Sequence, residues 1–137
     1  MAKLRHLAMV VEDIEKTASF YEKAFDMKRV RQHATAIGLS DGVVSLVIIS
    51  PDNVNMKGDD RRGLHHMGFL IDDMEDVAAK VEANGARYHG EILGVGRGPM
   101  GERKYLDPNG VMFDITTAEH ARETWRIKVE AEDATAE

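Results

Sequence analysis

Hydrophobic and polar residues recur in the same order twice along the chain. The stretches 4–13 (LRHLAMVVED) and 64–73 (LHHMGFLIDD) each contain a histidine, a small residue two positions later, a run of apolar residues and an acidic pair at the end. Corresponding positions, such as His6 and His66, lie 60 residues apart. The pattern therefore predicts two copies of one structural unit.

Each copy begins with a strand and continues into a helix. Alternating residues such as Leu7, Met9 and Val11 predict a strand with one buried face. Asp13 and Asp73 then stand where a helix N-cap is expected. Apolar residues follow both caps at helical spacing; they are Ile14, Ala18, Tyr21 and Phe25 in the first copy and Met74, Val77, Ala78 and Val81 in the second.

Three further strands complete each copy. They are expected at about 29–34, 35–39 and 43–49 in the first copy and at about 87–93, 102–106 and 111–116 in the second. Turn-forming residues separate the last two strands at 40–42 and at 107–110. The order β, α, β, β, β occurs twice, which predicts an α+β fold of two tandem βαβββ modules.

The modules are expected to share one domain. The predicted parts are a domain at 1–117, made of module one (1–50), a connector (51–63) and module two (64–117), and a tail at 118–137. The connector shows no periodicity, so its charge cluster at 57–62 is expected to be solvated.

Two stretches of the second half lack a strand pattern. The glycine-rich stretch 94–101 leads into a strand, so a hairpin loop or lid is favoured over a phosphate-binding loop, which would open a helix. The tail is predicted to form a short C-terminal helix and then a frayed acidic end. Trp125 is expected to anchor this helix to the body or to a second subunit.

Composition narrows the possible functions. The chain has no cysteine, so any metal must be held by nitrogen and oxygen ligands. The net charge of −6 divides into −3 for the tail and −3 for residues 1–117, so the body has no basic stripe for nucleic acid. The N-terminus is charged, and the longest apolar run, 43–49, is too short to span a membrane. A cytoplasmic protein is therefore expected.

Strand alternation places three potential metal ligands on one face. If residues such as Leu7 and Phe113 pack beneath the helices, His6, His66 and Asp114 lie on the opposite face, beside small residues. Two imidazoles and a carboxylate suit a divalent ion with open coordination positions, such as Fe²⁺, Mn²⁺, Ni²⁺, Co²⁺ or Zn²⁺. From the residues alone a second interpretation stays open, in which the histidines are hydrogen-bonded core residues and the aspartate is a cap.

Four segments resemble the vicinal oxygen chelate superfamily, which includes glyoxalase I, extradiol dioxygenases, methylmalonyl-CoA epimerase, fosfomycin-resistance proteins and bleomycin-binding proteins. The segments are 6–13 (HLAMVVED), 19–25 (SFYEKAF), 66–73 (HMGFLIDD) and 105–115 (YLDPNGVMFDI). The resemblance covers about residues 3–117. It implies paired βαβββ modules whose mixed sheet curls around a cup, with the helices on the outer face and a metal at the cup floor.

The resemblance also implies roles for individual residues. His6, His66 and Asp114 match the metal ligands, although the superfamily more often has glutamate at the last position. Aligning the two turns puts Leu46 opposite Asp114, where glyoxalase I has a second glutamate. Leucine cannot bind a metal, so four-ligand glyoxalase I chemistry is disfavoured. Asp26 replaces a glycine that usually follows the first helix, and aspartate tolerates that backbone geometry.

Other polar residues on the predicted strands could line the cup and supply an acid, a base or an anion contact. The candidate catalytic residues are Tyr105, Glu102 and His33, with Arg103 and His89 as further candidates. His65 falls on the other face of its strand, so a supporting or structural role is expected for it.

The sequence favours a metal-dependent enzyme that acts on a small oxygenated molecule. Its reaction would be that of a lyase or isomerase through an enolate, or of an extradiol dioxygenase if the ion is Fe²⁺. The alternative is a metal-free protein that binds a planar ligand, as bleomycin-binding relatives do. A thiol-transfer enzyme of the fosfomycin type ranks lower, because its substrate-binding residues have no match here. A homodimer is expected, since modules of the superfamily often pair across chains.

Overall fold

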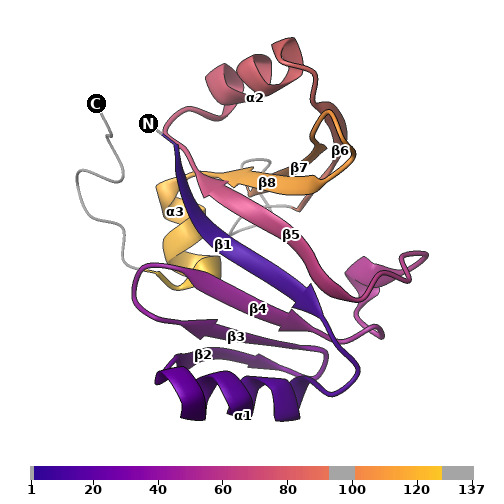
Figure 1. Cartoon of the computed structure of the whole chain (residues 1–137). Helices are drawn as coiled ribbons and strands as arrows, with labels where there is room; N and C mark the ends of the chain where they lie inside the picture. Colours follow the sequence, from indigo (N-terminus) through magenta and orange to yellow (C-terminus); the bar gives the residue numbers. More distant parts are fainter. Residues whose placement is uncertain (1, 93–100, 128–137) are drawn as a thin grey trace.

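The computed structural model describes residues 2–92 and 101–127 (Figure 1). Module one contains β1 (Lys3–Val10), α1 (Ile14–Phe25), β2 (Lys28–His33), β3 (Ala36–Ser40) and β4 (Ser45–Ile49). Module two contains β5 (Gly63–Leu70), α2 (Met74–Ala83), β6 (Arg87–Ile92), β7 (Glu102–Leu106) and β8 (Met112–Thr116). A 3-10 helix (Val54–Met56) lies between the modules, and α3 (Ala118–His120) and a π-helical turn (Ala121–Trp125) follow them. The predicted order of elements is confirmed; the glycine-rich loop and the acidic end of the tail fall almost wholly outside the described residues.

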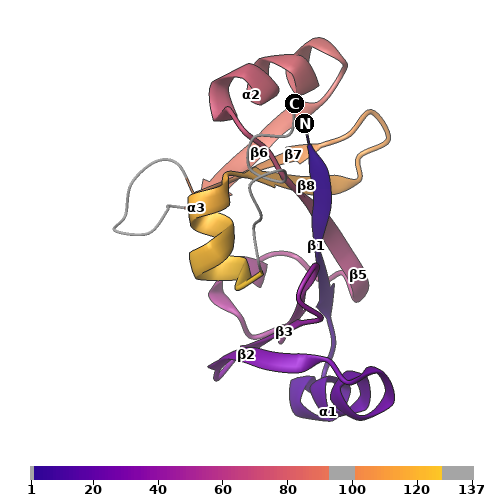
Figure 2. The ribbon, with the colours of Figure 1, turned by 90° about the vertical axis from the view of Figure 1, so that its left-hand side faces the viewer.

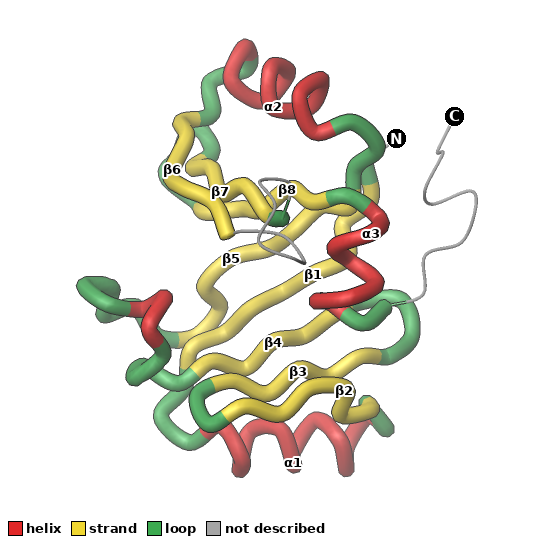
Figure 3. Tube along the Cα trace, turned by 180° about the vertical axis from the view of Figure 1, so that it is seen from behind, coloured by secondary structure: helices red, strands yellow, loops and turns green. Residues whose placement is uncertain are grey.

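The strands form one open, mixed sheet in the order β2-β3-β4-β1-β5-β8-β7-β6. β1 and β5 pair antiparallel at its centre, and each runs parallel to the last strand of its own module, β4 or β8. The register pairs His6 with Gly68 and Ala8 with His66. Figures 1 and 3 show that the sheet curls, so the two modules of a single chain build the cup.

α1 and α2 cover the outer face of the sheet. Ala18 of α1 packs with Leu39 and Ile48, and Met74 of α2 packs with Phe113. The bulky residues of both first strands lie on this same face. The alternation read from the sequence is therefore confirmed, and it leaves the opposite face for polar residues.

The helix ends also follow the sequence. The side chains of Asp13 and Asp73 accept hydrogen bonds from the backbone N–H groups of Lys16 and Asp76, as N-caps do. Asp26 ends α1 in the left-handed backbone region, with φ of 57°. This is the geometry for which glycine is usual and aspartate is tolerated.

The C-terminal segment lies on the inner face, unlike the other helices. Trp125 is 1% exposed and stacks on His6, while Leu70 and Ile127 pack beside it. Figure 2 shows α3 beside the strands, at a level between α1 and α2. The predicted short C-terminal helix is thus present, and it lies on the face opposite to α1 and α2. None of the described helices is long and apolar enough to cross a membrane.

Candidate metal centre

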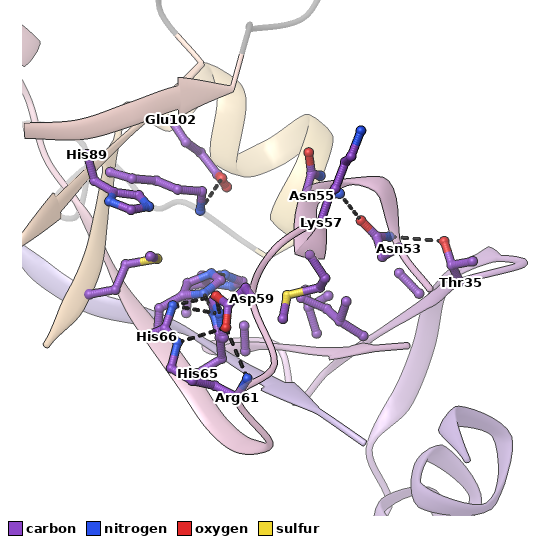
Figure 4. A pocket seen from close by; sticks show the side chains of 18 of the residues that line it. Thr35, Asn53, Asn55, Lys57, Asp59, Arg61, His65, His66, His89 and Glu102 are labelled. Atoms are coloured by element: carbon purple, nitrogen blue, oxygen red, sulfur yellow. Dashed lines mark hydrogen bonds and ion pairs between the residues drawn. The ribbon is translucent and has the colours of Figure 1, made fainter. Parts of the chain in front are cut away.

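A cavity of about 850 Å³ occupies the inner face of the sheet. Strands of both modules, the connector and the C-terminal segment line it (Figure 4). The charge cluster of the connector, which was expected to be solvated, contributes Lys57, Asp59 and Arg61 to the lining of this cavity, and Asn53 and Asn55 line it as well.

His6 and His66 line this cavity, and the buried Asp114 converges with them beneath its surface. The Nε2 atoms of the two histidines lie 3.4 Å apart, and Asp114 Oδ2 lies 3.8 Å from the first and 3.2 Å from the second. Nitrogen and oxygen donors held at about 2.1 Å around a tetrahedral ion lie about 3.4 Å from one another. The three atoms therefore have the mutual spacing of ligands around one divalent ion.

Ser45 and burial prepare His6 to act as a ligand. The Nδ1 atom of His6 lies 3.1 Å from Ser45 Oγ, which leaves Nε2 to face the other two groups. Burial lowers the pKa of His6 from 6.5 to about 4, although the carboxylates of Glu102 and Asp114 oppose the shift. His6 is therefore neutral at pH 7, the state in which imidazole binds metal.

A chain of hydrogen bonds holds His66 from the connector. The Nδ1 atoms of His65 and His66 lie 2.7 Å apart, and Nε2 of His65 lies 2.7 Å from Asp59 Oδ2. Hydrogen bonds from Arg61 and His65 keep the pKa of Asp59 low, so its carboxylate accepts the Nε2–H of His65. His65 then accepts Nδ1–H from His66, which leaves the lone pair of His66 Nε2 directed at the metal position.

Replacing His65 by Phe is expected to weaken metal binding about 10- to 100-fold, the usual effect of removing a group that orients a metal-bound histidine. His65→Gln should recover part of the loss, because its amide oxygen can accept the same N–H. A competition titration with a fluorescent chelator measures both. His33→Phe, which removes another cavity histidine, is the control, and equal losses in it and in His65→Phe would contradict the orienting role.

Asp114 supplies the observation that bears most directly on a metal. Its side chain is fully buried; Oδ1 accepts a hydrogen bond from Lys104 Nζ at 2.7 Å, while Oδ2 has no hydrogen-bond partner among the described residues. An unpaired buried carboxylate oxygen facing two imidazole lone pairs is costly. A cation bound between the three groups removes that cost, so the residues fit a divalent ion.

Gly68 allows this packing. A Cβ atom at position 68 would lie 2.9 Å from both Cβ and Cδ2 of His6 and 2.9 Å from the indole of Trp125. Gly68→Ala is therefore expected to push His6 out of place and to lower the free energy of unfolding by about 1–3 kcal/mol, as overpacking does. Urea denaturation followed by circular dichroism measures the loss. An unchanged midpoint would show that the two rings move aside freely.

Glu102 is the second buried carboxylate of the cavity. Its Oε1 accepts a hydrogen bond from the indole N–H of Trp125 and lies 3.5 Å from His120 Nε2, and its Oε2 lies 3.9 Å from Lys104 Nζ. Burial alone would raise the pKa of Glu102, but His120 and the positive charge of Lys104 outweigh it and hold the pKa below its usual value. Glu102 is therefore ionised at neutral pH.

The other candidate residues divide between the two faces. His33 and His89 line the cavity with Glu102. Tyr105 lies on the outer face, where it is 1% exposed and its hydroxyl contacts Glu82 of α2. Arg103 points the same way and pairs with Glu75. The expectation that Tyr105 and Arg103 could line the cup is wrong, because they alternate with Glu102 and Lys104 along β7.

Leu46 does not occupy the position equivalent to Asp114, contrary to the alignment of the turns. The register pairs Ala8 with Val47 and Gly68 with Asp114, so Val47 is the module-one equivalent of Asp114. Leu46 packs beneath α1 instead. Valine cannot bind a metal either, so the cup offers no fourth protein ligand at this position.

Several residues of the site were not predicted from the sequence. They are Ser45, Asp59, Lys104 and the indole of Trp125. Lys104 alone had a usable signal, since it lies two positions from Glu102 on one strand and so shares its face. Because Trp125 is buried within its own chain, it no longer supports the predicted homodimer, which stays a prediction.

Comparisons with known proteins agree with this architecture. No curated protein matches the chain by sequence. The solved structure of hypothetical protein BH1468 from Bacillus halodurans C-125 aligns with a TM-score of 0.64 and 16% identity, covering 85% of this chain and 94% of that one. Methylmalonyl-CoA epimerase from Mycobacterium tuberculosis aligns with a TM-score of 0.62 and 18% identity, covering 83% and 86%. A methylmalonyl-CoA epimerase in complex with methylmalonyl-CoA and NH4+ gives 0.61 and 22%, covering 85% and 94%.

At these identities the solved structures establish the fold alone. A family model is more specific, because it matches residues 3–115, which contain both modules and all three converging side chains. The chain belongs to the Glyoxalase/Bleomycin resistance protein/Dioxygenase superfamily.

Proposed function

We propose that the protein is a divalent-metal-dependent enzyme of the isomerase type, which moves a proton on a carbon next to a carbonyl group of a small oxygenated molecule. The observation that carries the proposal is the unpaired Oδ2 of Asp114, buried and facing the Nε2 atoms of His6 and His66. The structural likeness to methylmalonyl-CoA epimerases favours the isomerase among the reactions open to the superfamily.

His6, His66 and Asp114 would hold the ion. Val47, the module-one equivalent of Asp114, cannot bind it. A divalent ion bound there would polarise the carbonyl oxygen of the substrate and make the neighbouring C–H more acidic. Three protein ligands leave coordination positions open for substrate oxygens, as catalytic sites require.

We assign the proton transfer to Glu102. Its carboxylate lines the cavity, is ionised, and is fixed through Oε1 by the indole of Trp125, so Oε2 is the atom that accepts the proton. A carboxylate of low pKa is a weak base, and it needs a substrate whose C–H has been made acidic. Lys104 Nζ, which contacts both Asp114 and Glu102, supplies positive charge where negative charge develops.

The test has a metal arm and an exchange arm. Untagged protein incubated with Fe²⁺, Mn²⁺, Ni²⁺, Co²⁺ or Zn²⁺ is expected to retain about one ion per chain by inductively coupled plasma mass spectrometry. The metal-loaded protein is then mixed in D2O with methylmalonyl-CoA and with α-hydroxyketones, and loss of the α-proton is followed by NMR. Metal-dependent exchange supports the proposal.

Glu102→Gln is the matched variant for the exchange arm. It keeps an oxygen for the indole N–H of Trp125, and it should retain the metal but lose exchange by about a hundredfold or more. Exchange that survives in Glu102→Gln would move the base to another residue. Ligand binding that is complete in the presence of chelator, with no retained ion, would overturn the enzyme and favour a metal-free binding protein.

A further inference from the structure

Arg31 reaches the inner face because β2 contains a bulge. The pairing with β3 shifts between Arg29, which is opposite Leu39, and Arg31, which is opposite Gly38. Leu39 belongs to the core beneath α1, and Arg29 accordingly pairs with Glu22 of that helix. The extra residue turns Arg31 to the other face, where it lines the cavity. A bulge that redirects one side chain beside a binding site is a recurrent device in sheets.

Arg31 and His66 stand at the two ends of one row across the sheet. The paired positions of the row are Arg31 and Gly38, Gly38 and Val47, Val47 and Ala8, and Ala8 and His66. The three positions between the ends carry no polar side chain, and Ala36, Ile49 and Met56 extend this apolar floor. The cavity thus has the metal position at one end, a guanidinium at the other, and an apolar surface between them.

Gly38 provides the space for Arg31. A Cβ atom at position 38 would lie 3.2 Å from Cβ, 3.7 Å from Cγ and 3.8 Å from Cδ of Arg31. The stem of the arginine therefore lies against the backbone of β3. A larger residue at position 38 would displace it.

In the described part of the chain, no carboxylate hydrogen-bonds the guanidinium. One N–H donates to the carbonyl oxygen of Thr124 at 2.8 Å, and another lies 3.1 Å from Nε2 of His33. A guanidinium carries five N–H donors, so these contacts leave three. Burial and the charge of Arg126 lower the pKa of Arg31, although the carboxylate of Glu102 opposes the shift.

We propose that Arg31 binds a carboxylate of the substrate, whose oxygenated head lies at the metal and is joined to the carboxylate by an apolar segment. This inference rests on the proposed function for the position of the head. A single guanidinium matches a carboxylate in charge and can bind it through two parallel hydrogen bonds. The substrate class is thus an oxygenated carboxylic acid that spans the row from His66 to Arg31.

The test uses hydroxamates, which chelate metals through two adjacent oxygens. Metal-loaded protein is titrated by calorimetry with ω-carboxyalkyl hydroxamates of increasing chain length and with alkyl hydroxamates of equal length. In the natural protein we expect the carboxylate to raise affinity about tenfold or more at one chain length, the contribution of a charged hydrogen bond.

Three variants test whether Arg31 is responsible for this increase in affinity. Arg31→Gln can keep the bond to Thr124 without the charge, and it should lose the gain. Gly38→Ala should reduce the gain, because the added Cβ lies 3.2 Å from Cβ of Arg31 and shifts the arginine slightly. Arg29→Gln removes the neighbouring arginine that faces α1, and it should keep the gain in full. A gain that survives in Arg31→Gln would overturn the assignment. So would the absence of a gain at every chain length in natural protein that binds the plain alkyl hydroxamates.

A titration of metal-free protein tests the carboxylate site independently of the metal site. The metal-free protein is titrated with glutarate, and the Nε–H signal of Arg31 is followed by NMR. A shift of this signal supports the carboxylate site even if plain alkyl hydroxamates fail to bind the metal-loaded protein. Such a failure would count against the metal proposal alone. No shift, together with no gain in the hydroxamate series, would overturn the carboxylate site.

Discussion

Asp114→Asn is expected to lower the affinity for a divalent ion by more than about a hundredfold, so that the purified variant retains almost no metal. Asparagine has nearly the same volume and can still accept from Lys104 Nζ, so the substitution removes the negative charge and little else. That charge is what two neutral histidines cannot supply to a divalent ion. Losing a direct ligand should cost more than the 10- to 100-fold typical of groups that only orient a ligand.

Metal content by mass spectrometry and the rise of Tm on adding metal measure this effect. A bound ion stabilises the folded state in proportion to the logarithm of its concentration over Kd, so the rise in Tm should vanish with the affinity. Asp76→Asn is the control, because the same change then falls on an exposed carboxylate of α2. A full equivalent of ion in Asp114→Asn would show that the site is not built around this carboxylate.

The face on which these ligands lie was predictable from the sequence. Alternation has a period of two, so once bulky residues are assigned to the helix side, His6, His66 and Asp114 fall on the other side without knowledge of contacts. The repeat adds the second fact needed, since it makes the two first strands equivalent and predicts a shared location for their histidines. The fold and the face that carries the ligands could thus be predicted from strand alternation and from the internal repeat.

The positions of Leu46 and Arg31 could not be predicted because single residues are inserted in their strands. β4 begins three residues after Gly42, whereas β8 begins two residues after Gly110, so aligning the turns selected Leu46 instead of Val47. The bulge in β2 likewise reverses the face of Arg31 relative to simple alternation. A shift of one residue moves a side chain to the opposite face, and nothing in the local pattern announces it.

The partners of the ligands were not predictable for another reason. Asp59 belongs to an irregular connector and Trp125 to the C-terminal segment, and the positions of such segments depend on tertiary contacts. The sequence showed that Trp125 would anchor the tail, but it left open whether the anchor lies on this chain or on a second one. Its position on His6 makes it part of the cup.

Trp125→Ala is expected to lower the free energy of unfolding by about 3–5 kcal/mol, the range for removing a large buried side chain. The indole is 1% exposed and stacks on His6 with ring centroids 4.6 Å apart and planes at 11°. Truncation would leave a void against the imidazole of His6. It would also leave Oε1 of the buried Glu102 without its indole donor.

Trp125→Phe separates the two contributions. Phenylalanine keeps an aromatic ring against His6 but has no N–H, so the loss should fall to about 1–3 kcal/mol, the cost of an unsatisfied buried group. Urea denaturation followed by circular dichroism is the suitable measurement, because both variants lack the only tryptophan and hence its fluorescence.

Leu64→Ala is the control for the stability series, since Leu64 is 73% exposed and its loss should change stability by less than about 0.5 kcal/mol. If Trp125→Ala costs no more than this control, the C-terminal segment merely lies on a domain that is stable without it. A large loss, accompanied by weaker metal binding, would show that the segment beyond the two modules is a structural part of the metal centre. That result follows from the stacking of Trp125 on His6, because the void would free the imidazole to leave the orientation that Ser45 and Gly68 impose.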